Sequence, residues 1–350
     1  MCTVITVKEI AQMCNVSPST VSNILNGRPN VGEETRQRVL EVIKETGYQP
    51  NYFAQSMRKQ SSKMISIVVE DLGEFSTPPI VEAAMAYCDD MGYRAILMNM
   101  RLYDKWQKDW YDDEDKVKSV LLPLIQEMQS IRVDGMLYIA GHCRHIDYFP
   151  KEFKLPGVIA YGISEGGRYP SVVIDDEKGG YDIARYLIEQ GHTCIGVIAG
   201  SDNNLHTRSR LDGFCKALQE RKVPYDPRLV RYGDWKRGSG YQEAAYLVEQ
   251  GVTAIFCMND SMAAGVYDYL REKGLTIGQD ISVVGYDNKE LSKYLYPALT
   301  TNEIPLRVIG QKAAELLIDH IEDKEQEATG GMLVKLPCEM RYRDSVDKLK

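Results

Sequence analysis

The sequence predicts a mixed α/β protein with a small three-helix head, a linker and two doubly wound α/β lobes. Three short helical patterns fill residues 1–50, which predicts the head. From Met64 onward, short runs of β-branched residues alternate with helical segments, which indicates parallel sheets covered by helices on both faces. The chain has 350 residues, and this length fits two such half-domains better than one very large sheet.

Composition and cysteine spacing restrict the class of protein. The chain has no apolar run near the ~18 residues that a membrane span requires. Its N-terminus, MCTVITVKEIAQM, lacks the charged start and uninterrupted apolar run of a secretion signal. We therefore expect a cytoplasmic protein with no membrane partner. The eight cysteines include no CxxC pair, and His142, Cys143 and His145 have no fourth ligand in register, so neither a metal nor a cofactor is expected.

Charge is distributed unevenly along the chain. Residues 1–63 carry eight Lys and Arg against five acidic residues, a net charge of +3, whereas the remainder nets −11. A basic head on an acidic body fits a segment that binds phosphates and a body that stays off nucleic acid. An excess of three charges over 63 residues is also small enough to arise by chance.

The first two helices of the head have clear boundaries. Apolar residues recur at helical spacing over residues 7–14, and Thr6 is a good N-cap for this helix. Asn15 tolerates the left-handed conformation of a tight turn. Ser17 and Pro18 then provide an N-cap and a first helical position for the second helix.

The second helix has a small polar face, and the third helix closes the head. The outward face of the second helix consists of Ser19, Thr20, Ser22 and Asn23. It lacks long charged side chains, as expected for a helix placed in the major groove of DNA. The third helix, residues 33–46, should end at Gly47 and pack Val39, Leu40, Val42 and Ile43 inward. On spacing alone, a plain structural helical hairpin is the alternative.

The body alternates strand and helix patterns. Strands are expected at residues 65–69, 94–98, 134–139, 157–161, 194–199, 253–258 and 281–286. Helices are expected at about 79–91, 117–130, 177–190, 209–221, 239–250, 261–273 and 305–322. The sequence contains neither GxGxxG after a strand nor a GxxxxGK[ST] phosphate loop, and its five histidines make a hidden catalytic triad improbable. The chain is therefore not expected to be an enzyme.

The head resembles a known family over its whole length. The run from Thr6 to Gln60 is similar to the helix-turn-helix and hinge of the lactose-repressor (LacI/GalR) family of bacterial transcription regulators. The most specific pieces are VSPSTVSNILNG, TRQRVLEVIKETGYQPN and the spacing Asn51-x-x-Ala54-x-x-Met57-Arg58. The resemblance implies base contacts at Pro18, Ser19 and Asn23. It implies phosphate contacts at Thr6, Ser17, Thr20, Ser22, Asn26 and Tyr48.

Two residues depart from the family pattern. Pro18 has no side-chain hydrogen-bonding group and no N–H, so it can offer a base only apolar contact, such as to a thymine methyl. Met57 stands where the family usually has a leucine that wedges into the minor groove. Methionine is apolar and flexible enough to act as the wedge, so a softer kink in the DNA is expected.

The linker and the domain boundaries follow from the same resemblance. Residues 51–63 are too few and too polar for a stable isolated helix. The resemblance implies that they form a hinge helix on operator DNA, paired with the twin from the other subunit. The expected domains are thus a DNA-binding head at 1–50, a hinge at 51–63, and an effector-sensing and dimerisation domain at 64–345.

The body resembles the sensor of the same family, which is of the periplasmic-binding-protein type. Its pieces include RSRLDGF, GDWKRGSGY, FCMNDSMAAG and DISVVGYDN. The resemblance implies one lobe at about 64–162 and 297–324, and a second at 163–296 and 325–343. It implies an effector between the lobes, where loops after strand ends form a crevice. The matching residues are Phe75, Asp176, Arg210, Trp235, Asn259 and Asp287.

These residue types suit a sugar. Arg210, Asp287 and Asn259 offer fixed donors and acceptors for vicinal hydroxyls. Trp235 offers a flat apolar face for a pyranose ring. The alternatives are a structural ion pair across the cleft for Arg210 and Asp287, and a core position for Trp235. For Phe75 a structural role is as well supported as a binding role.

One segment is unlike the family, and the assembly is expected to be simple. Residues 101–116 form a longer and more charged connection than usual, with two tryptophans. It could cover the cleft or touch a partner, but an insertion folded back on its own lobe is favoured. The chain ends shortly after MRYRDSV without a leucine-heptad tail, so a homodimer is expected rather than a tetramer.

Two hypotheses for function follow. The first is a sequence-specific DNA-binding transcription regulator, expected to be a repressor, whose affinity for double-stranded operator DNA changes with a small-molecule effector, expected to be a sugar. The second is an operator-bound protein that answers mainly to a partner protein and has a vestigial cleft. Quenching of Trp235 fluorescence by free sugars would discriminate between them.

Overall fold

The computed structural model of the chain describes residues 5–25, 27–48, 61–111, 113–322 and 331–349. The chain divides into two compact units, a head of residues 1–63 and a body of residues 64–350. Among the described residues, no helix is both long and apolar enough to span a bilayer.

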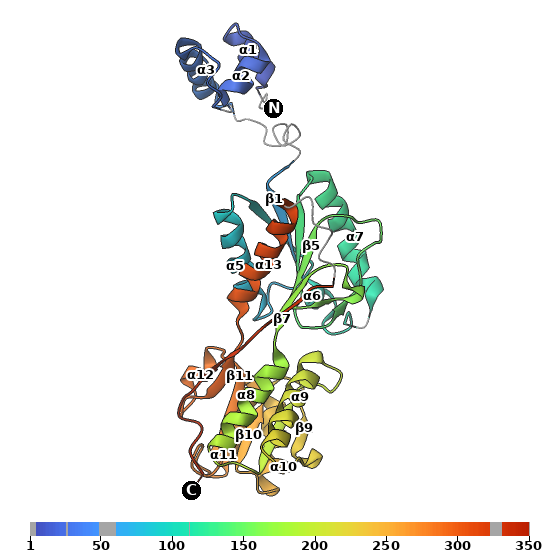
Figure 1. Cartoon of the computed structure of the whole chain (residues 1–350), viewed down its shortest axis with the longest axis vertical. Helices are drawn as coiled ribbons and strands as arrows, with labels where there is room; N and C mark the ends of the chain where they lie inside the picture. The colour runs from blue at the N-terminus through green and yellow to red at the C-terminus, as the bar shows by residue number, and fades with distance from the viewer. Residues whose placement is uncertain (1–4, 26, 49–60, 112, 323–330, 350) are drawn as a thin grey trace. The chain divides into compact units, whose positions relative to one another are not determined.

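The head consists of the three expected helices, α1 (Val7–Met13), α2 (Pro18–Leu25) and α3 (Glu33–Thr46) (Figure 1). The Thr6 hydroxyl accepts from the Glu9 backbone N–H, and the Glu9 carboxylate accepts from the Thr6 N–H at 2.7 Å, which completes a capping box. Asn15 is left-handed, with φ 49°, and so is Gly47, with φ 63°, as the sequence predicts.

The core of the head is small, and one expected member is absent from it. Its buried residues are Ile10, Ala11, Cys14, Val21, Ile24, Val39 and Tyr48. Leu40, expected inside, is 46% exposed. A neighbouring residue in a helix lies about 100° around the axis, so Val39 and Leu40 cannot both face the same small core.

The body contains two six-stranded sheets, one in each lobe (Figure 1). The first has the order β13-β7-β5-β3-β1-β2 and is parallel throughout. The second has the order β14-β12-β11-β10-β8-β9, with β14 antiparallel to β12. The strands of the first are β1 (Met64–Val69), β2 (Arg94–Asn99), β3 (Gly135–Ile139), β5 (Gly157–Ala160), β7 (Ser171–Ile174) and β13 (Leu333–Leu336). Those of the second are β8 (Ile195–Ala199), β9 (Val230–Tyr232), β10 (Ala254–Cys257), β11 (Ser282–Asp287), β12 (Thr300–Glu303) and β14 (Glu339–Arg341). The short strands β4 (His145–Ile146) and β6 (Ile163–Ser164) pair separately.

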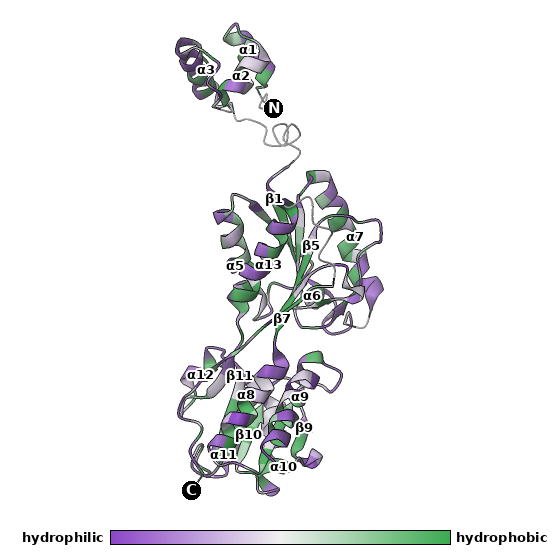
Figure 2. Ribbon diagram, viewed as in Figure 1, coloured by the Kyte–Doolittle hydropathy of each residue, from purple (hydrophilic) through white to green (hydrophobic). Residues whose placement is uncertain are grey.

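Helices cover both sheets. The helices of the body are α5 (Thr77–Asp90), α6 (Leu102–Trp106), α7 (Glu114–Ile131), α8 (Asp176–Glu189), α9 (Leu205–Glu220), α10 (Arg237–Glu249), α11 (Asp260–Glu272), α12 (Leu291–Tyr294) and α13 (Leu306–Glu322). In β1, Ile65, Ile67 and Val69 pack in the core beneath α5 and α13, whereas Val68 faces the opposite core beneath α7. The alternation of β-strand side chains explains this division. Figure 2 shows the resulting pattern, with strands mostly hydrophobic and the helices mixed.

The chain crosses between the lobes three times. The family resemblance implies more than one crossing, but the crossings lie elsewhere than expected. Strand β7 follows residue 162 yet pairs with β5 in the first sheet. Strand β12 follows residue 297 yet pairs with β11 in the second, and β13 returns to the first. The predicted lobe limits at 162/163, 296/297 and 324/325 are therefore wrong by about ten residues, because short strands alone do not reveal which sheet they join.

Helices α8 and α9 are in backbone contact. A Cβ atom on Gly180 would lie 2.0 Å from the Arg210 carbonyl oxygen, and one on Gly213 would lie 1.8 Å from the Glu177 carbonyl oxygen. Only glycine permits this approach. The two glycines thereby fix the position of α9 and of Arg210, which it carries.

Candidate functional site

A cavity of about 650 Å³ lies between the two lobes of the body. Its size falls within the ~300–1,000 Å³ typical of small-molecule sites. Residues that follow strand ends contribute to it from both sheets, at the carboxyl edges where open parallel sheets bind ligands. The lining includes Glu74, Phe75, Tyr103, Lys108, Tyr111, His142, Cys143, Tyr161, His206, Arg210, Asp234, Trp235, Lys236, Asn259, Asp287 and Lys289.

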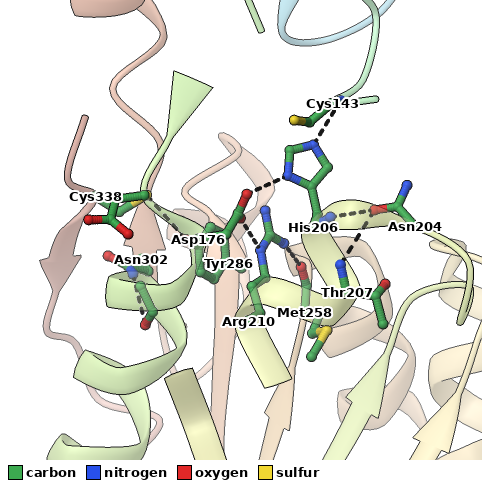
Figure 3. Close-up of polar contacts among 12 residues, drawn as sticks. Cys143, Asp176, Asn204, His206, Thr207, Arg210, Met258, Tyr286, Asn302 and Cys338 are labelled. Carbon is green, nitrogen blue, oxygen red and sulfur yellow. Dashed lines mark hydrogen bonds and ion pairs between the residues drawn. The ribbon is translucent and has the colours of Figure 1, made fainter. Parts of the chain in front are cut away.

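A buried ionic network forms the floor of the cleft in the second lobe (Figure 3). Asp176, at the start of α8, accepts from Nε of Arg210 at 2.7 Å and bonds Nδ1 of His206 at 2.7 Å. Burial alone would raise the pKa of Asp176. The charges and hydrogen bonds of His206 and Arg210 outweigh burial and hold it below its ordinary value. Asp176 is therefore a carboxylate that positions two cleft residues.

Arg210 is almost completely buried and held on three sides. Its Nε binds Asp176, its Nη1 donates to the Met258 carbonyl, and its guanidinium lies 3.6 Å from the centre of the Tyr286 ring. Burial would lower its pKa, but Asp176 more than compensates and raises it, so Arg210 is cationic. Among the described residues, Nη2 has no hydrogen-bond partner. One guanidinium edge is thus available to a ligand in a fixed orientation.

Asp287 ends β11 in an unusual backbone conformation. Its φ is 104°, and its carboxylate lies 3.2 Å from the Lys289 ammonium. Burial raises its pKa, and the charges of Lys289 and Arg210 oppose that rise. The buried Asp260 carboxylate, which accepts from the Thr301 hydroxyl at 2.6 Å, adds a second acidic group to this corner.

Trp235 presents its ring to the cleft and is held by Asn259. The Trp235 ring covers Gly200 so closely that a Cβ there would lie 1.8 Å from it. Asn259 donates from Nδ2 to the Trp235 carbonyl at 2.9 Å and accepts from the Met262 N–H at 2.8 Å as the N-cap of α11. Both polar atoms of Asn259 are therefore already bonded, which favours a positioning role for this amide.

Three lining residues that are not glycine have left-handed backbones. These are Tyr161 (φ 61°), Trp235 (φ 68°) and Asp287 (φ 104°). Such conformations cost on the order of 1–3 kcal/mol each and persist where the surrounding structure enforces them, as at binding sites. These three residues make the cleft the candidate binding site of the body.

Contacts between described residues join the lobes across the cleft, and one of them is that of the Tyr161 ring, whose centre lies 5.4 Å from that of the His206 ring. The Cys143 backbone N–H in the first lobe donates to Nε2 of His206 at 3.2 Å. The Lys289 ammonium lies 4.1 Å from the centre of the Phe75 ring. Because Nε2 accepts, His206 carries its proton on Nδ1, which donates to Asp176. The sequence prediction did not include His206, although it lies four residues before Arg210 on the same face of α9.

The inserted segment folds back on the first lobe, as favoured from the sequence, and it also reaches the cleft. Trp110 is 2% exposed, and the Arg144 guanidinium lies 4.6 Å from the centre of its ring. Arg144 in turn pairs with the fully buried Glu70. The segment also contributes Tyr103, Lys108 and Tyr111 to the lining of the cleft.

In the head, six of the residues expected to contact DNA lie on α2 or at its N-cap, namely Ser17, Pro18, Ser19, Thr20, Ser22 and Asn23. The Ser17 hydroxyl caps α2 by accepting from the Thr20 N–H at 3.1 Å, and it lies 2.6 Å from the Ser19 hydroxyl. Pro18 and Ser19 are exposed, and Thr20, Ser22 and Asn23 are half-buried. Tyr48 is buried in the head core. Asn26, Ala54, Met57 and Arg58 lie outside the described residues.

The six predicted effector residues separate into two groups. Phe75, Arg210, Trp235, Asn259 and Asp287 all line the cavity, whereas Asp176 lies behind it and supports Arg210. The alternative ion pair between Arg210 and Asp287 is not formed, since Arg210 pairs with Asp176 and Asp287 with Lys289. The described parts of the chain contain no cluster of three His, Cys, Asp or Glu residues suited to a metal ion.

Comparison with known proteins agrees with both units. Residues 6–51 match the bacterial regulatory proteins of the lacI family, and residues 184–346 match the periplasmic binding protein-like domain. The chain is 30% identical over 349 residues to the HTH-type transcriptional repressor PurR of Vibrio parahaemolyticus serotype O3:K6, covering 98% of this chain and 99% of PurR. It is 31% identical over 327 residues to PurR of Vibrio atlanticus, covering 92% and 93%.

Solved structures show the same architecture. The lac repressor dimer bound to operator and the anti-inducer ONPF superposes with a TM-score of 0.78 at 25% identity, covering 99% of this chain and all of that one. The transcriptional regulator CelR in complex with cellobiose gives 0.66 at 26% identity, covering 97% and 99%. These relatives are transcriptional repressors and a transcriptional regulator rather than enzymes, which agrees with the sequence prediction for this chain. The chain therefore belongs to the lacI family of bacterial regulatory proteins and is a DNA-binding transcription regulator with an effector-binding domain.

Proposed function

We propose that this protein is a cytoplasmic homodimeric repressor whose affinity for operator DNA is controlled by a sugar bound between the lobes. The observation that carries the proposal is the arrangement of Arg210, Trp235 and Asp287 around one cavity. A fixed cationic donor, a flat apolar face and a carboxylate suit a ring with hydroxyls on its edge and C–H bonds on its face. A related structure holds cellobiose, which agrees with this chemistry.

A nucleobase is the second candidate effector. Its flat ring would stack on Trp235, and its edge would bond Arg210 and Asp287. The chain is similar to the repressor PurR over 98% of its length, so nucleobases are tested beside sugars in the ligand screen described below. The two classes differ in what they need from the rest of the cleft, because a sugar requires polar partners around its whole edge.

The head supplies the DNA-binding half of the proposal. The exposed Pro18 and Ser19 and the half-buried Asn23, all on α2, would meet base edges. The hydroxyls of Ser17 and Thr20 would meet phosphates. A two-fold dimer reads two half-sites, so the operator should be nearly palindromic. The related lac repressor binds its operator as a dimer.

The two lobes give the effector a way to act. Arg210 and Asp287 lie on the second lobe and Phe75 on the first, so a ligand that touches both favours one lobe arrangement over another. A coupling of ~1–3 kcal/mol would change operator affinity by ~5–150-fold. The contact between His206 and the Cys143 backbone would be the first to respond, since it joins the lobes at the same floor.

The test combines a ligand screen with operator titration. Sugars, sugar phosphates and nucleobases are screened by thermal shift on the full chain, and each hit is added to an operator titration. Arg210→Ala should abolish the effect of the hit on operator affinity, and Arg237→Ala, at an exposed ion pair with Asp268, should not. Trp235→Phe, a milder change, should remove the fluorescence quenching caused by the hit.

Three results would contradict the proposal. One is an operator affinity that no small molecule changes, which would favour control by a partner protein. Another is a full response in the folded Arg210→Ala variant. The third is a single half-site bound as tightly as a full site, which would exclude operator binding by a dimer that contacts two half-sites.

A further inference from the structure

The inserted segment of the first lobe is firmly attached to that lobe. The Leu102 N–H donates to the Glu70 carbonyl at 3.1 Å, and the Tyr103 N–H donates to the Asp71 carboxylate. Leu102 is fully buried, as is Trp110. These contacts hold residues 102–111 as a built wall of the cleft, so the side chains that it directs into the cavity keep defined positions.

Among the described residues, this wall carries polar groups that make no hydrogen bond or ion pair with the protein. Tyr103, Lys108 and Tyr111 line the cavity, and so does His142, whose ring lies 4.5 Å from that of Tyr111. In the parts of the chain that the structure describes, neither tyrosine hydroxyl, neither ring nitrogen of His142, nor the Lys108 ammonium has a hydrogen bond or an ion pair. The opposite wall differs, because Arg210, Asn259 and Asp287 are largely occupied by protein partners.

The protonation of these groups suits hydroxyl recognition. Burial, followed by the Arg144 charge, lowers the pKa of His142 to about 3, so its imidazole is neutral and has one donor and one acceptor. Burial, followed by Glu74 and Glu70, raises the pKa of Tyr111 to about 12, so its phenol keeps its proton. Neutral groups that both donate and accept match sugar hydroxyls, which do the same.

The wall lies across the cleft from the Trp235 loop. Burial raises the pKa of the Asp234 carboxyl, but hydrogen bonds to Ser239 and Lys236 and the Lys236 charge lower it more. The charge of Lys108 also acts on Asp234 and lowers this pKa further. Asp234 immediately precedes Trp235, and Lys108 belongs to the other lobe. A ligand ring placed on Trp235 therefore has the inserted wall beyond it. The cavity of about 650 Å³ is far larger than a single sugar ring. A single ring bound on Trp235 would therefore not contact the inserted wall.

We propose that Tyr103, Lys108, Tyr111 and His142 form a second subsite, which binds the distal ring of a disaccharide or glycoside. The first ring would occupy the site of Arg210, Trp235 and Asp287. This inference rests on the proposed function and makes the effector class narrower, from a sugar to a sugar of two rings. It also gives the insertion a role, since it is the part of the body that departs from the family pattern.

The experiment compares affinities for one ring and for two. Isothermal titration of the full-length protein uses glucose, galactose and fructose, and the disaccharides cellobiose, maltose, lactose and sucrose. At least one disaccharide should bind tenfold or more tightly than either of its component sugars. Tyr111→Phe and Lys108→Ala should each weaken that disaccharide by about two- to tenfold, the loss of one hydrogen bond to the ligand. The affinity for a single ring should stay within twofold.

Matched controls separate local from general effects. Tyr232→Phe removes a hydroxyl that is exposed outside the cleft, and Lys151→Ala removes an exposed ammonium outside it. Neither should change any affinity. Tyr111→Phe deletes one oxygen atom, and circular dichroism of each variant confirms that the fold is retained.

Each other outcome overturns the subsite. It is overturned if no disaccharide binds better than its component rings, or if both variants weaken single rings and disaccharides equally. A sugar phosphate that depends on Lys108 but not on Tyr111 would assign the wall to a phosphate instead. A nucleobase that binds, changes operator affinity and ignores both variants would overturn the subsite while the proposed regulation by a cleft ligand stands.

Discussion

Asp176 is the residue whose removal tests the buried network most directly. Asp176→Asn keeps the shape of the side chain but removes the negative charge that faces Nε of Arg210 at 2.7 Å. The new amide can keep one acceptor oxygen on Arg210 and turn its NH2 toward His206. His206 would then have to accept at Nδ1 and carry its proton on Nε2. In that tautomer it faces the Cys143 N–H with a second donor, so the bond between the lobes is lost.

The magnitude follows from burial. Arg210 and Asp176 are 2% and 7% exposed, so water cannot replace the missing partner. Removing one member of a buried ion pair costs about 3–5 kcal/mol, and a lost hydrogen bond to a charged group about 1.5–3 kcal/mol. Because asparagine retains one of the two bonds, we expect the free energy of unfolding of the body to fall by about 3 kcal/mol, more than a hundredfold in the equilibrium constant.

Urea unfolding of the full chain at pH 7, followed by circular dichroism and tryptophan fluorescence, measures this change. The control is Asp268→Asn, which removes a carboxylate of the same kind from Arg237, whose side chain is 63% exposed. Exposed pairs contribute about 0–1 kcal/mol, so this variant should resemble the parent. If Asp176→Asn cost no more than Asp268→Asn, the network would not be the floor on which the cleft depends.

Three further changes test other parts of the molecule. The pKa of His142 is about 3 in the folded protein and ~6.5 in the unfolded chain, so His142 makes stability fall as the pH drops below about 6.5, by at most about 1.4 kcal/mol per pH unit. His142→Gln should remove this dependence, and urea unfolding at pH 7 and pH 5 measures whether the variant loses it. Gly180→Ala should lower the melting temperature of the body, at a cost of about 1–3 kcal/mol, because the new Cβ would meet the Arg210 carbonyl. Gly238→Ala in α10 has open space and should stabilise by up to about 1 kcal/mol, so equal melting temperatures would contradict the packing described. Thr6→Ala should speed amide hydrogen exchange in α1, since it removes a capping box worth about 1 kcal/mol, and unchanged exchange would show that the cap contributes nothing.

The sequence predicted the elements with long and regular patterns. All seven helices and seven strands expected in the body are present, with ends within a few residues. The strands that it did not predict are short and often polar, such as β9 (Val230–Tyr232) and β12 (Thr300–Glu303). Such segments become strands because a neighbouring edge offers backbone partners, and this information is tertiary. The same reason explains why the lobe limits were misplaced around β7.

The sequence analysis predicted most residues of the candidate site but not the ion pairs and hydrogen bonds among them. Arg210 lies on an expected helix and Asp287 ends an expected strand, whereas Trp235 follows β9, which the pattern did not locate. The family resemblance, rather than the pattern of strands and helices, brought the three residues together. That Asp176 would pair with Arg210, rather than face the ligand, depends on the approach of α8 to α9 through glycine. The sequence shows the glycines but not which helices they bring together.

The three crossings of the chain have a consequence for how such proteins diversify. The head is one continuous stretch of 63 residues, so a single recombination event could exchange it for another and alter the DNA sequence that is read. Neither lobe is continuous, because each is assembled from separate stretches that alternate along the chain. No single exchange of gene segments can replace one lobe and leave the other intact. New ligand preferences must therefore arise inside an existing pair of lobes, through point substitutions or through added loops such as residues 102–111.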